Sequence, residues 1–243
     1  MANLRADLHI HTVLSPCGDL EMSPVNIIRI AGEKGLDIIG ITDHNSTRQS
    51  AIIRDYGKEK GIYVLTGAEV TTEEEAHCLA FFPDDKRLTE FQAYLDVHLP
   101  GIQNNPEKFG YQVVADLQDN IIYQEEILLI SALDQNIEEV EKKVHELDGI
   151  FIPAHIDKTR FSILSQLGFI PRDLKYDALE LSPHTQTEFF LTQHPELKQA
   201  AFIQSSDAHY PEQIGCVSTI LSLHEISFEA IRKAIHKQNI HIF

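Results

Sequence analysis

Residues 7–11 read DLHIH, and three later apolar stretches end in the same kinds of side chain: GITDH at 40–44, PAHID at 153–157 and SSDAH at 205–209. Residues this far apart in a sequence can meet at one place if their strands run side by side in parallel. The carboxyl ends of the strands of a parallel barrel share one mouth, which is where active sites lie. The pattern therefore predicts a parallel α/β barrel with several metal ligands at its mouth.

Short apolar strands alternate with amphipathic helices along the chain, as in parallel α/β folds. Strands are expected at 6–10, 36–41, 62–66, 77–82, 150–153, 178–181, 201–204 and 217–221. Helices are expected at 24–34, from 45 or 46 to about 60, at 88–99, 137–147 and 228–237. About seven of the strands form the core, one short of the usual eight. Residues 1–243 are expected to form one domain, with a lid or excursion around 84–130 and a hairpin at 111–124.

The composition sets limits on the location of the protein. No apolar run approaches the roughly 18 residues that cross a membrane, and the N-terminus enters the first motif without a signal-peptide core. Three cysteines, Cys17, Cys78 and Cys216, fit neither a disulfide framework nor a paired-cysteine zinc site. We therefore expect a reduced, cytoplasmic protein that does not associate with membranes. Its oligomeric state is not determined by the sequence.

The formal net charge is −17, and Lys and Arg form no cluster. A protein that holds a long nucleic acid usually has a basic face, so we expect no long nucleic acid as a partner. A small phosphorylated substrate is still compatible with this charge, because bound cations dominate the local field of a metal site.

The candidate ligands recur at strand-like spacings. His9 and His11 are two residues apart and would share one face of a strand, and Asp207 and His209 repeat this spacing. Asp43 and His44 end one apolar stretch, and His155 follows another; Asp43 could instead be a helix N-cap.

Between these motifs lie Glu69 and His77. A carboxylate can bridge two cations, and Gly67 would allow a close approach of backbone and ligand at Glu69. The acids at 73–75 are more typical of a solvated loop. We expect the remaining histidines to lie at the surface, with His184 as a candidate for the mouth: His98, His145, His184, His194, His224, His236 and His241.

The motifs DLHIHT, ITDH, GAEV, EEAHC, PAHID and SSDAH resemble, in this order and over nearly the whole chain, those of the PHP (polymerase and histidinol phosphatase) family. The resemblance implies a distorted (β/α)7, TIM-like barrel that holds two or three divalent metal ions and acts as a compact, stand-alone phosphoesterase. By this resemblance, a first metal takes His9, His11, Glu69 and Asp207, and a second shares Glu69 and adds His77 and His155. A third takes His44 and His209 with a loop ligand, for which Asp19 is preferred to Glu21.

Closely spaced cations lower the pKa of a bridging water, and the resulting hydroxide would attack phosphorus in line. Asp43 or His209 is a candidate acid for the leaving group. The ligands are nitrogen and oxygen atoms, which permits Zn, Mn or Fe. Arg48, Lys158 and Arg160 follow the motifs and are candidate phosphate-binding residues, although such side chains are usually solvated.

The leading hypothesis is a phosphatase for a small phosphomonoester or nucleotide. The alternative is a phosphodiesterase or exonuclease that acts on the ends of short oligonucleotides. An amidohydrolase is less favoured, because no Lys lies where that class places its bridging carbamylated Lys and Glu69 takes this role. A non-catalytic metal-binding module is disfavoured because the ligand set is intact.

Overall fold

The computed structural model describes residues 1–236 and 240–242, with side chains through residue 236. The strands are β1 (Ala2–Ile10), β2 (Ile38–Ile41), β3 (Tyr63–Thr71), β4 (His77–Phe82), β5 (Val113–Ala115), β6 (Ile121–Gln124), β7 (Ile150–Pro153), β8 (Leu179–Leu181), β9 (Phe202–Gln204), β10 (Thr219–Leu223) and β11 (Ile240–Ile242). The helices are α1 (Pro24–Glu33), α2 (Ser50–Lys60), α3 (Asp85–His98), α4 (Pro106–Phe109), α5 (Ile137–Glu146), α6 (Ile163–Leu167), α7 (Thr187–Gln193) and α8 (Phe228–His236), with short 3-10 turns η1 (Pro195–Leu197) and η2 (Pro211–Gln213).

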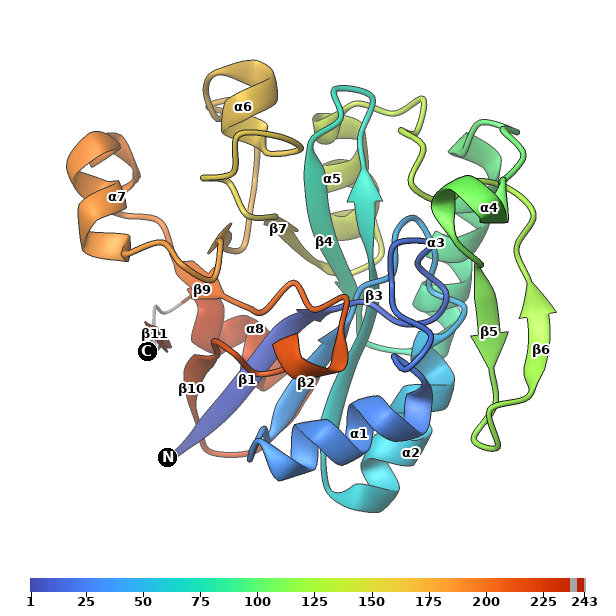
Figure 1. Ribbon diagram of the computed structural model, residues 1–243. Coiled ribbons are helices and arrows are strands. Elements are labelled where there is room, and N and C mark those ends of the chain that lie inside the picture. Colours follow the sequence, from blue (N-terminus) through green and yellow to red (C-terminus); the bar gives the residue numbers. More distant parts are fainter. Residues whose placement is uncertain (237–239, 243) are drawn as a thin grey trace.

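A seven-stranded sheet in the order β11-β10-β1-β2-β3-β4-β7 forms the centre of the molecule (Figure 1). The pairs β1–β2 and β2–β3 are parallel, whereas β10 runs antiparallel to β1 and β4 runs antiparallel to both β3 and β7. The expectation that all core strands are parallel is therefore wrong for β4 and β10. The reason is the short connection from β3 to β4: residues 72–76 form a tight hairpin, and a parallel pair needs a crossover of a dozen or more residues.

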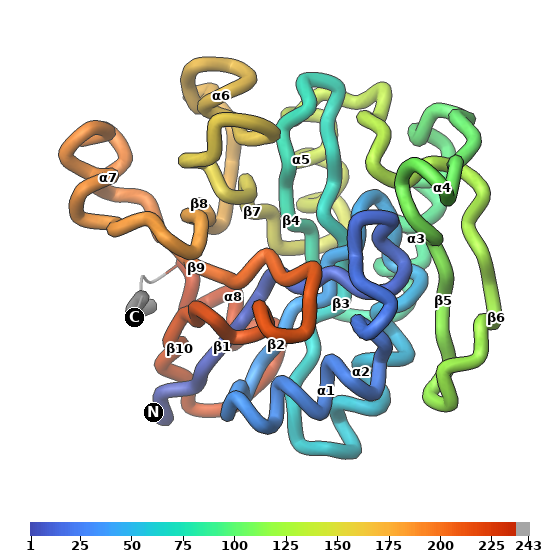
Figure 2. Tube along the Cα trace, viewed as in Figure 1, coloured from blue at the N-terminus to red at the C-terminus, as the bar shows by residue number. Residues whose placement is uncertain are grey.

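The sheet curls because β8 and β9, which form a separate parallel pair, connect its two sides (Figure 2). The Ile156 amide donates to the Glu180 carbonyl, which links the end of β7 to β8. The His11 amide donates to the Ala208 carbonyl, which links the end of β1 to the segment after β9. The result is an α/β fold with a curled, half-barrel sheet, consistent with the TIM-like class.

Two expected element boundaries need correction. Helix α2 begins at Ser50, with Gln49 as its N-cap, and not at Asn45 or Ser46. Asn45 has a left-handed backbone (φ 44°), and its amide group donates to the Leu129 and Ser131 carbonyls and accepts from Thr71. Asn45 thus ties three loops together and is unavailable as a cap.

Helix α3 occupies the beginning of the expected excursion at 84–130 but belongs to the core. Its Leu88, Phe91 and Leu95 are buried and pack against β4 and α5. The rest of the range holds α4 and the antiparallel hairpin β5–β6, as expected for 111–124, and this hairpin lies at one side of the molecule (Figure 1). The expected end of the last helix at Lys237 and the side chain of His241 lie outside the described residues.

Of the histidines expected at the surface, His236 is exposed and His145 is half-buried, and both belong to one hydrogen-bond network around Asp177. The His145 ring bonds to Glu141 and, at 3.2 Å, to Asp177, and Asp177 also bonds to His236 of α8 and accepts from the Phe151 amide. The hydrogen bond to Asp177 raises the pKa of His145, against partial burial. Burial acts to raise the pKa of Asp177, but bonds to His145, Phe151 and His236 lower it overall.

This network predicts a pH-dependent stability. His145 has a raised folded-state pKa, so its contribution is fully present below about pH 6.5 and is lost as the pH rises through the folded value. We expect His145→Gln to lower the free energy of unfolding by about 0.5–1 kcal/mol more at pH 5.5 than at pH 8.5 in urea titrations, a size typical of half-exposed ion pairs. Equal losses at the two pH values would contradict the assignment, and His224→Gln on the exposed surface is the matched control.

Candidate metal centre

Side chains from separate strand ends converge at one edge of the curled sheet. His9 and His11 share one face of the end of β1, His44 follows β2, and Glu69 lies in β3. His77 is the first residue of β4 and pairs with Thr71. Because β4 is antiparallel to β3, its start lies at the edge where the parallel strands end, and this places His77 beside Glu69.

Glu69 lies at the centre of this group. Its Oε1 is 3.3 Å from His9 Nε2, 2.9 Å from His77 Nδ1 and 3.1 Å from His155 Nε2. Its Oε2 is 3.4 Å from His11 Nε2 and 3.1 Å from His44 Nδ1. Burial opposes ionisation of Glu69, but His77, His9 and His44 hold the pKa of its carboxyl well below the usual range. One buried carboxylate therefore has imidazole nitrogens around both of its oxygens.

This arrangement fits divalent cations. A carboxylate offers about four lone-pair directions, fewer than the five imidazoles around Glu69. His9 Nε2 and His11 Nε2 lie 3.1 Å apart, both directed at the same carboxylates. His44 Nδ1 is buried and, although near Glu69, makes no hydrogen bond. Cations shared between these atoms would satisfy all of them, and the imidazole and carboxylate donors suit Zn, Mn or Fe.

Three sets of ligand atoms lie close enough for one ion each: His9, His11 and Glu69; His44, Glu69 and His77; and His11, His44 and His209. The first and third agree with sites one and three expected from the resemblance, apart from the sharing of His11. His155 reaches Glu69 but not the second set, and Asp207 Oδ1 lies 3.3 Å from His9 and 3.4 Å from His11. The structure therefore brings together eight of the nine predicted ligands.

Asp19 is the predicted ligand that the structure does not bring in. Its Oδ1 accepts from the Glu21 amide of its own turn, and it joins none of the three sets among residues 1–236. Its backbone amide donates to the His209 carbonyl, which ties this loop to the segment after β9. The loop side chain that bonds to His44 is Ser15, whose hydroxyl accepts from the His44 backbone amide at 3.3 Å. Burial and His11 oppose protonation of His44, but Glu69 and the nearby Cys17 raise its pKa to about 9.

Two of the candidate ligands have a left-handed backbone conformation. His155 has φ 30° and Asp207 has φ 51°, a region that non-glycine residues seldom adopt. Such strain persists where the surrounding structure imposes it, often at functional sites. Both residues follow a strand and turn their side chains back over the sheet edge towards Glu69 and His9.

Glu180 in β8 contacts two of the candidate ligands, and none of the sequence motifs contains it. Its Oε2 lies 2.9 Å from His9 Nδ1 and also accepts from the His155 amide. Glu180 as acceptor keeps the proton on His9 Nδ1 and leaves Nε2 free for a cation, which is the usual role of a carboxylate behind a metal-binding histidine. A charged residue inside the buried stretch Leu179–Leu181 was the available signal.

Asp43 has the same role for His11 and is not a free acid. Its two oxygens accept from the Thr12 amide, the Thr12 hydroxyl and the Ser15 hydroxyl. Because the Ser15 hydroxyl donates to Asp43, it accepts from His11 Nδ1 at 2.9 Å and leaves His11 Nε2 for a cation. Both oxygens of Asp43 are thus occupied by groups of the loop after β1, an arrangement that suits positioning of His11 better than donation of a proton.

The three predicted phosphate-binding cations differ in their surroundings. The Arg48 guanidinium makes a two-pronged bond to Asp96 and lies over the Tyr123 ring, so its charge is already paired away from the ligand sets. Lys158 Nζ bonds to Asp207 Oδ2 at the rim of the centre; burial lowers its pKa, but Asp207 raises it overall. Arg160 is exposed beside Phe161, whose ring stacks on His77. Lys158 thus lies at the rim of the centre, Arg160 is exposed, and Arg48 is paired with Asp96.

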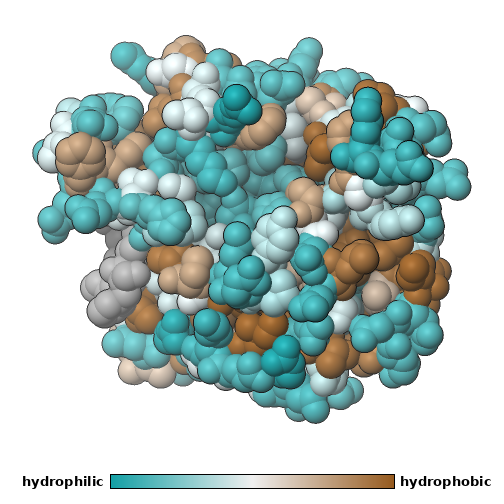
Figure 3. All heavy atoms as spheres, in the orientation of Figure 1, coloured by the Kyte–Doolittle hydropathy of each residue, from teal (hydrophilic) through white to brown (hydrophobic). Residues whose placement is uncertain are grey.

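The centre opens on a hydrophilic face. The space-filling view shows a hollow lined mainly by hydrophilic residues in the middle of this face, with hydrophobic atoms to its right (Figure 3). His209 stacks on His11 with ring centroids 4.0 Å apart, and burial, with His11, lowers the pKa of His209 to about 3. A neutral His209 is suited to bind a cation and unsuited to donate a proton near neutral pH.

The ligand motifs, their order and their convergence match a known family model. The PHP domain model matches residues 7–237. The chain belongs to the PHP family. Protein YqxK of Bacillus subtilis, whose function is uncharacterised, is 25% identical over 98% of the chain and 63% of its own length. Curated relatives are covered over 46% and 63% of their lengths, so the chain spans about half to two thirds of them.

Solved structures share this PHP fold. The endonuclease Q of Pyrococcus furiosus, a lesion-specific endonuclease, superimposes with a TM-score of 0.71 and 22% identity over 99% of this chain and 58% of its own. A complex of endonuclease Q with a 27-mer duplex that has an abasic lesion at the active site gives 0.69 and 21%, over 97% and 57%. A two-domain protein from Bacteroides vulgatus, containing a predicted PHP-like metal-dependent phosphoesterase, gives 0.60 and 18%, over 100% and 65%.

These structures correct the expectation that no long nucleic acid is a partner. Endonuclease Q, part of which has a fold like that of this chain, binds a 27-mer duplex with an abasic lesion at its active site. The net charge is a property of the whole surface, whereas a scissile phosphate meets only the local field of the site, which bound cations dominate.

Among the described residues, no helix is long and apolar enough to cross a membrane.

The role of Glu180 leads to a prediction. Glu180→Ala removes the acceptor that orients His9, and loss of such a partner typically weakens metal binding 10–100-fold. We expect this loss in competition titrations with a chelating dye, and we expect Glu180→Gln to recover part of it because its amide oxygen can still accept from His9 Nδ1. Unchanged affinity in the alanine variant would remove Glu180 from the site. Glu188→Ala, on the exposed surface of α7, is the control.

Proposed function

We propose that this PHP-family chain is a metal-dependent phosphodiesterase that hydrolyses a nucleic-acid strand, with the ligands at the strand ends of a distorted (β/α)7 barrel. The observation that carries the proposal is the Glu69 carboxylate, whose two oxygens face different groups of imidazoles. Support for the nucleic-acid substrate comes from the similarity of the fold to endonuclease Q. For this reason we propose a nucleic-acid strand, and not a small phosphomonoester, as the substrate.

The residues have separate roles in this proposal. His9, His11, Glu69 and Asp207 hold one cation, His44, His77 and His155 share Glu69 with a second, and His209 completes a third position with His11 and His44. Divalent cations bound there would supply Lewis-acid stabilisation of phosphoryl oxygens and a lowered pKa for bound water. Glu180 and Asp43, through Ser15, orient the imidazoles of His9 and His11.

In this proposal, Lys158 and Arg160 add positively charged side chains to a site whose candidate ligands are imidazoles and carboxylates. Lys158 Nζ reaches the rim of the centre at Asp207 and would orient a non-bridging phosphoryl oxygen or the leaving oxygen. Arg160 is exposed on the same loop and is placed to neutralise a neighbouring phosphate of the strand. We propose a reduced, cytoplasmic setting, supported by three cysteines that form no disulfide.

The test is hydrolysis across a matched panel with added Mn²⁺ or Zn²⁺. The panel contains one oligonucleotide as a single strand, as a duplex and as a duplex with an abasic site, together with p-nitrophenyl phosphate. We expect metal-dependent strand cleavage that EDTA abolishes and that His9→Ala lacks. Release of phosphate from the monoester without cleavage of any oligonucleotide would overturn the diesterase proposal and favour a phosphatase.

A further inference from the structure

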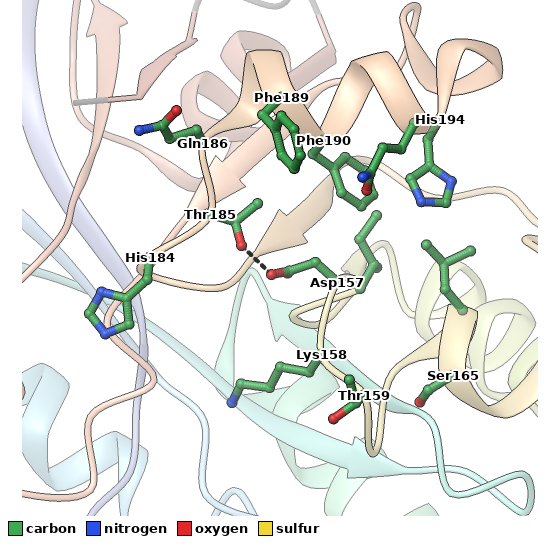
Figure 4. A pocket seen from close by; sticks show the side chains of 13 residues that line it. Asp157, Lys158, Thr159, Ser165, His184, Thr185, Gln186, Phe189, Phe190 and His194 are labelled. Carbon is green, nitrogen blue, oxygen red and sulfur yellow. Dashed lines mark hydrogen bonds between the residues drawn. The ribbon is translucent and has the colours of Figure 1, made fainter.

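A cavity of about 750 Å³ lies between α6 and α7, beside the metal centre (Figure 4). Ile156, Leu164 and Phe190 are among its lining residues, and its volume is in the range of small-molecule sites. In Figures 1 and 2, α6 and α7 project side by side beyond the carboxyl ends of β7 and β8.

Lys158 connects the cavity to the centre. It lines the cavity, and its Nζ bonds to Asp207 Oδ2, while Asp207 Oδ1 faces His9 and His11. A phosphate held at the centre would therefore have Lys158 beside it and the cavity behind Lys158. A group attached to that phosphate can extend past Lys158 into the cavity.

The Asp157 carboxylate gives the cavity a wall of acceptor atoms that favours hydrogen-bond donors. Asp157 lies at its middle, where its carboxylate accepts from the Ser182 amide at 2.7 Å and from the hydroxyls of Ser182 and Thr185. Lys158, the cationic side chain among the lining residues, is already paired with Asp207. An anionic wall repels a phosphate but accepts bonds from the amino or ring N–H groups of a neutral heterocycle.

The wall formed by α7 offers an aromatic surface. Phe189 lines the cavity and is 62% exposed, whereas the Phe190 ring is covered by His194 at 4.5 Å between centroids. In Figure 4, Phe189 and Phe190 lie above Asp157, with Thr159 and Ser165 below. A planar ring between these walls would stack on Phe189 and bond to Asp157, with the Gln186 amide at the rim.

We propose that this cavity binds the nucleobase of the nucleotide whose phosphate lies at the metal centre. The proposal rests on the proposed nucleic-acid substrate, since a base is the planar, donor-bearing group that such a phosphate carries. Stacking on one aromatic side chain typically strengthens the binding of a base by tenfold or more.

Binding of adenosine 5′-monophosphate and ribose 5-phosphate to the metal-loaded protein, by calorimetry, tests the cavity independently of turnover. We expect the nucleotide to bind about tenfold more tightly than the sugar phosphate. Phe189→Ala should abolish this difference without changing the affinity for ribose 5-phosphate, and Phe189→Trp should preserve it. Phe169→Ala, equally exposed but outside the cavity, is the matched control.

Equal affinities for the two ligands, or a nucleotide preference that survives in Phe189→Ala, would overturn the proposal. Hydrolysis of the oligonucleotide panel decides the proposed function separately. Strand cleavage with equal affinities would leave the phosphodiesterase standing without a base site. A Phe189-dependent preference without strand cleavage would establish the base site and reject the diesterase.

Discussion

Replacing Glu69 by glutamine is expected to remove at least one divalent cation from each chain and to lower turnover about 10³-fold. The carboxylate faces imidazoles through both oxygens and belongs to two of the three ligand sets, so two neighbouring cations would share it. An amide keeps the shape but loses the negative charge and replaces one acceptor oxygen with a donor. Loss of Lewis-acid stabilisation worth several kcal/mol corresponds to a rate loss of this order.

Elemental analysis and strand cleavage, measured on the same preparation, check this result. Glu73→Gln is the matched control, because Glu73 lies in the exposed turn between β3 and β4, near in sequence but with its side chain outside the three ligand sets. Full metal content in Glu69→Gln, with or without activity, would show that Glu69 does not bridge cations.

Gly67→Ala is expected to lower the free energy of unfolding by about 3 kcal/mol or more, as severe overpacking of a core does. A Cβ at Gly67 would lie 1.9 Å from the Ala80 carbonyl oxygen and 2.9 Å from the Phe81 ring, and the first of these is backbone and cannot rotate away. Glycine is thus needed at position 67 because the paired strands β3 and β4 approach each other closely there. The reason is not an approach of ligand to backbone at Glu69.

Urea titration of wild type and variant measures this loss. Gly101→Ala is the control, since a Cβ there meets no atom within 4 Å, and its effect should stay within about 0.5 kcal/mol. A Gly67→Ala protein as stable as the control would mean that β3 and β4 can separate without cost. Because β3 and β4 carry Glu69 and His77, a variant that folds with a shifted β4 should also bind metal more weakly.

The sequence by itself determined the family, the alternation of strands and helices, and most of the candidate ligands. These features are local: the i, i+2 pairs His9/His11 and Asp207/His209 need only a strand or its end to direct two side chains to one point. An apolar run that ends in a histidine or an acidic residue marks the end of a strand and the candidate ligand at that end. Such signals remain readable in one dimension because each depends on neighbours within a few residues.

Tertiary structure decided what depends on partners far along the chain. The antiparallel course of β4 places His77 at the correct edge, and Asp43 and Glu180 become positioning residues only because Ser15 and His9 meet them. Arg48, a predicted phosphate-binding residue, pairs with Asp96, which lies 48 residues away in the chain. Net charge, summed over the whole chain, gave a wrong exclusion of nucleic acid, since the field at a site is set by the few groups that folding gathers there.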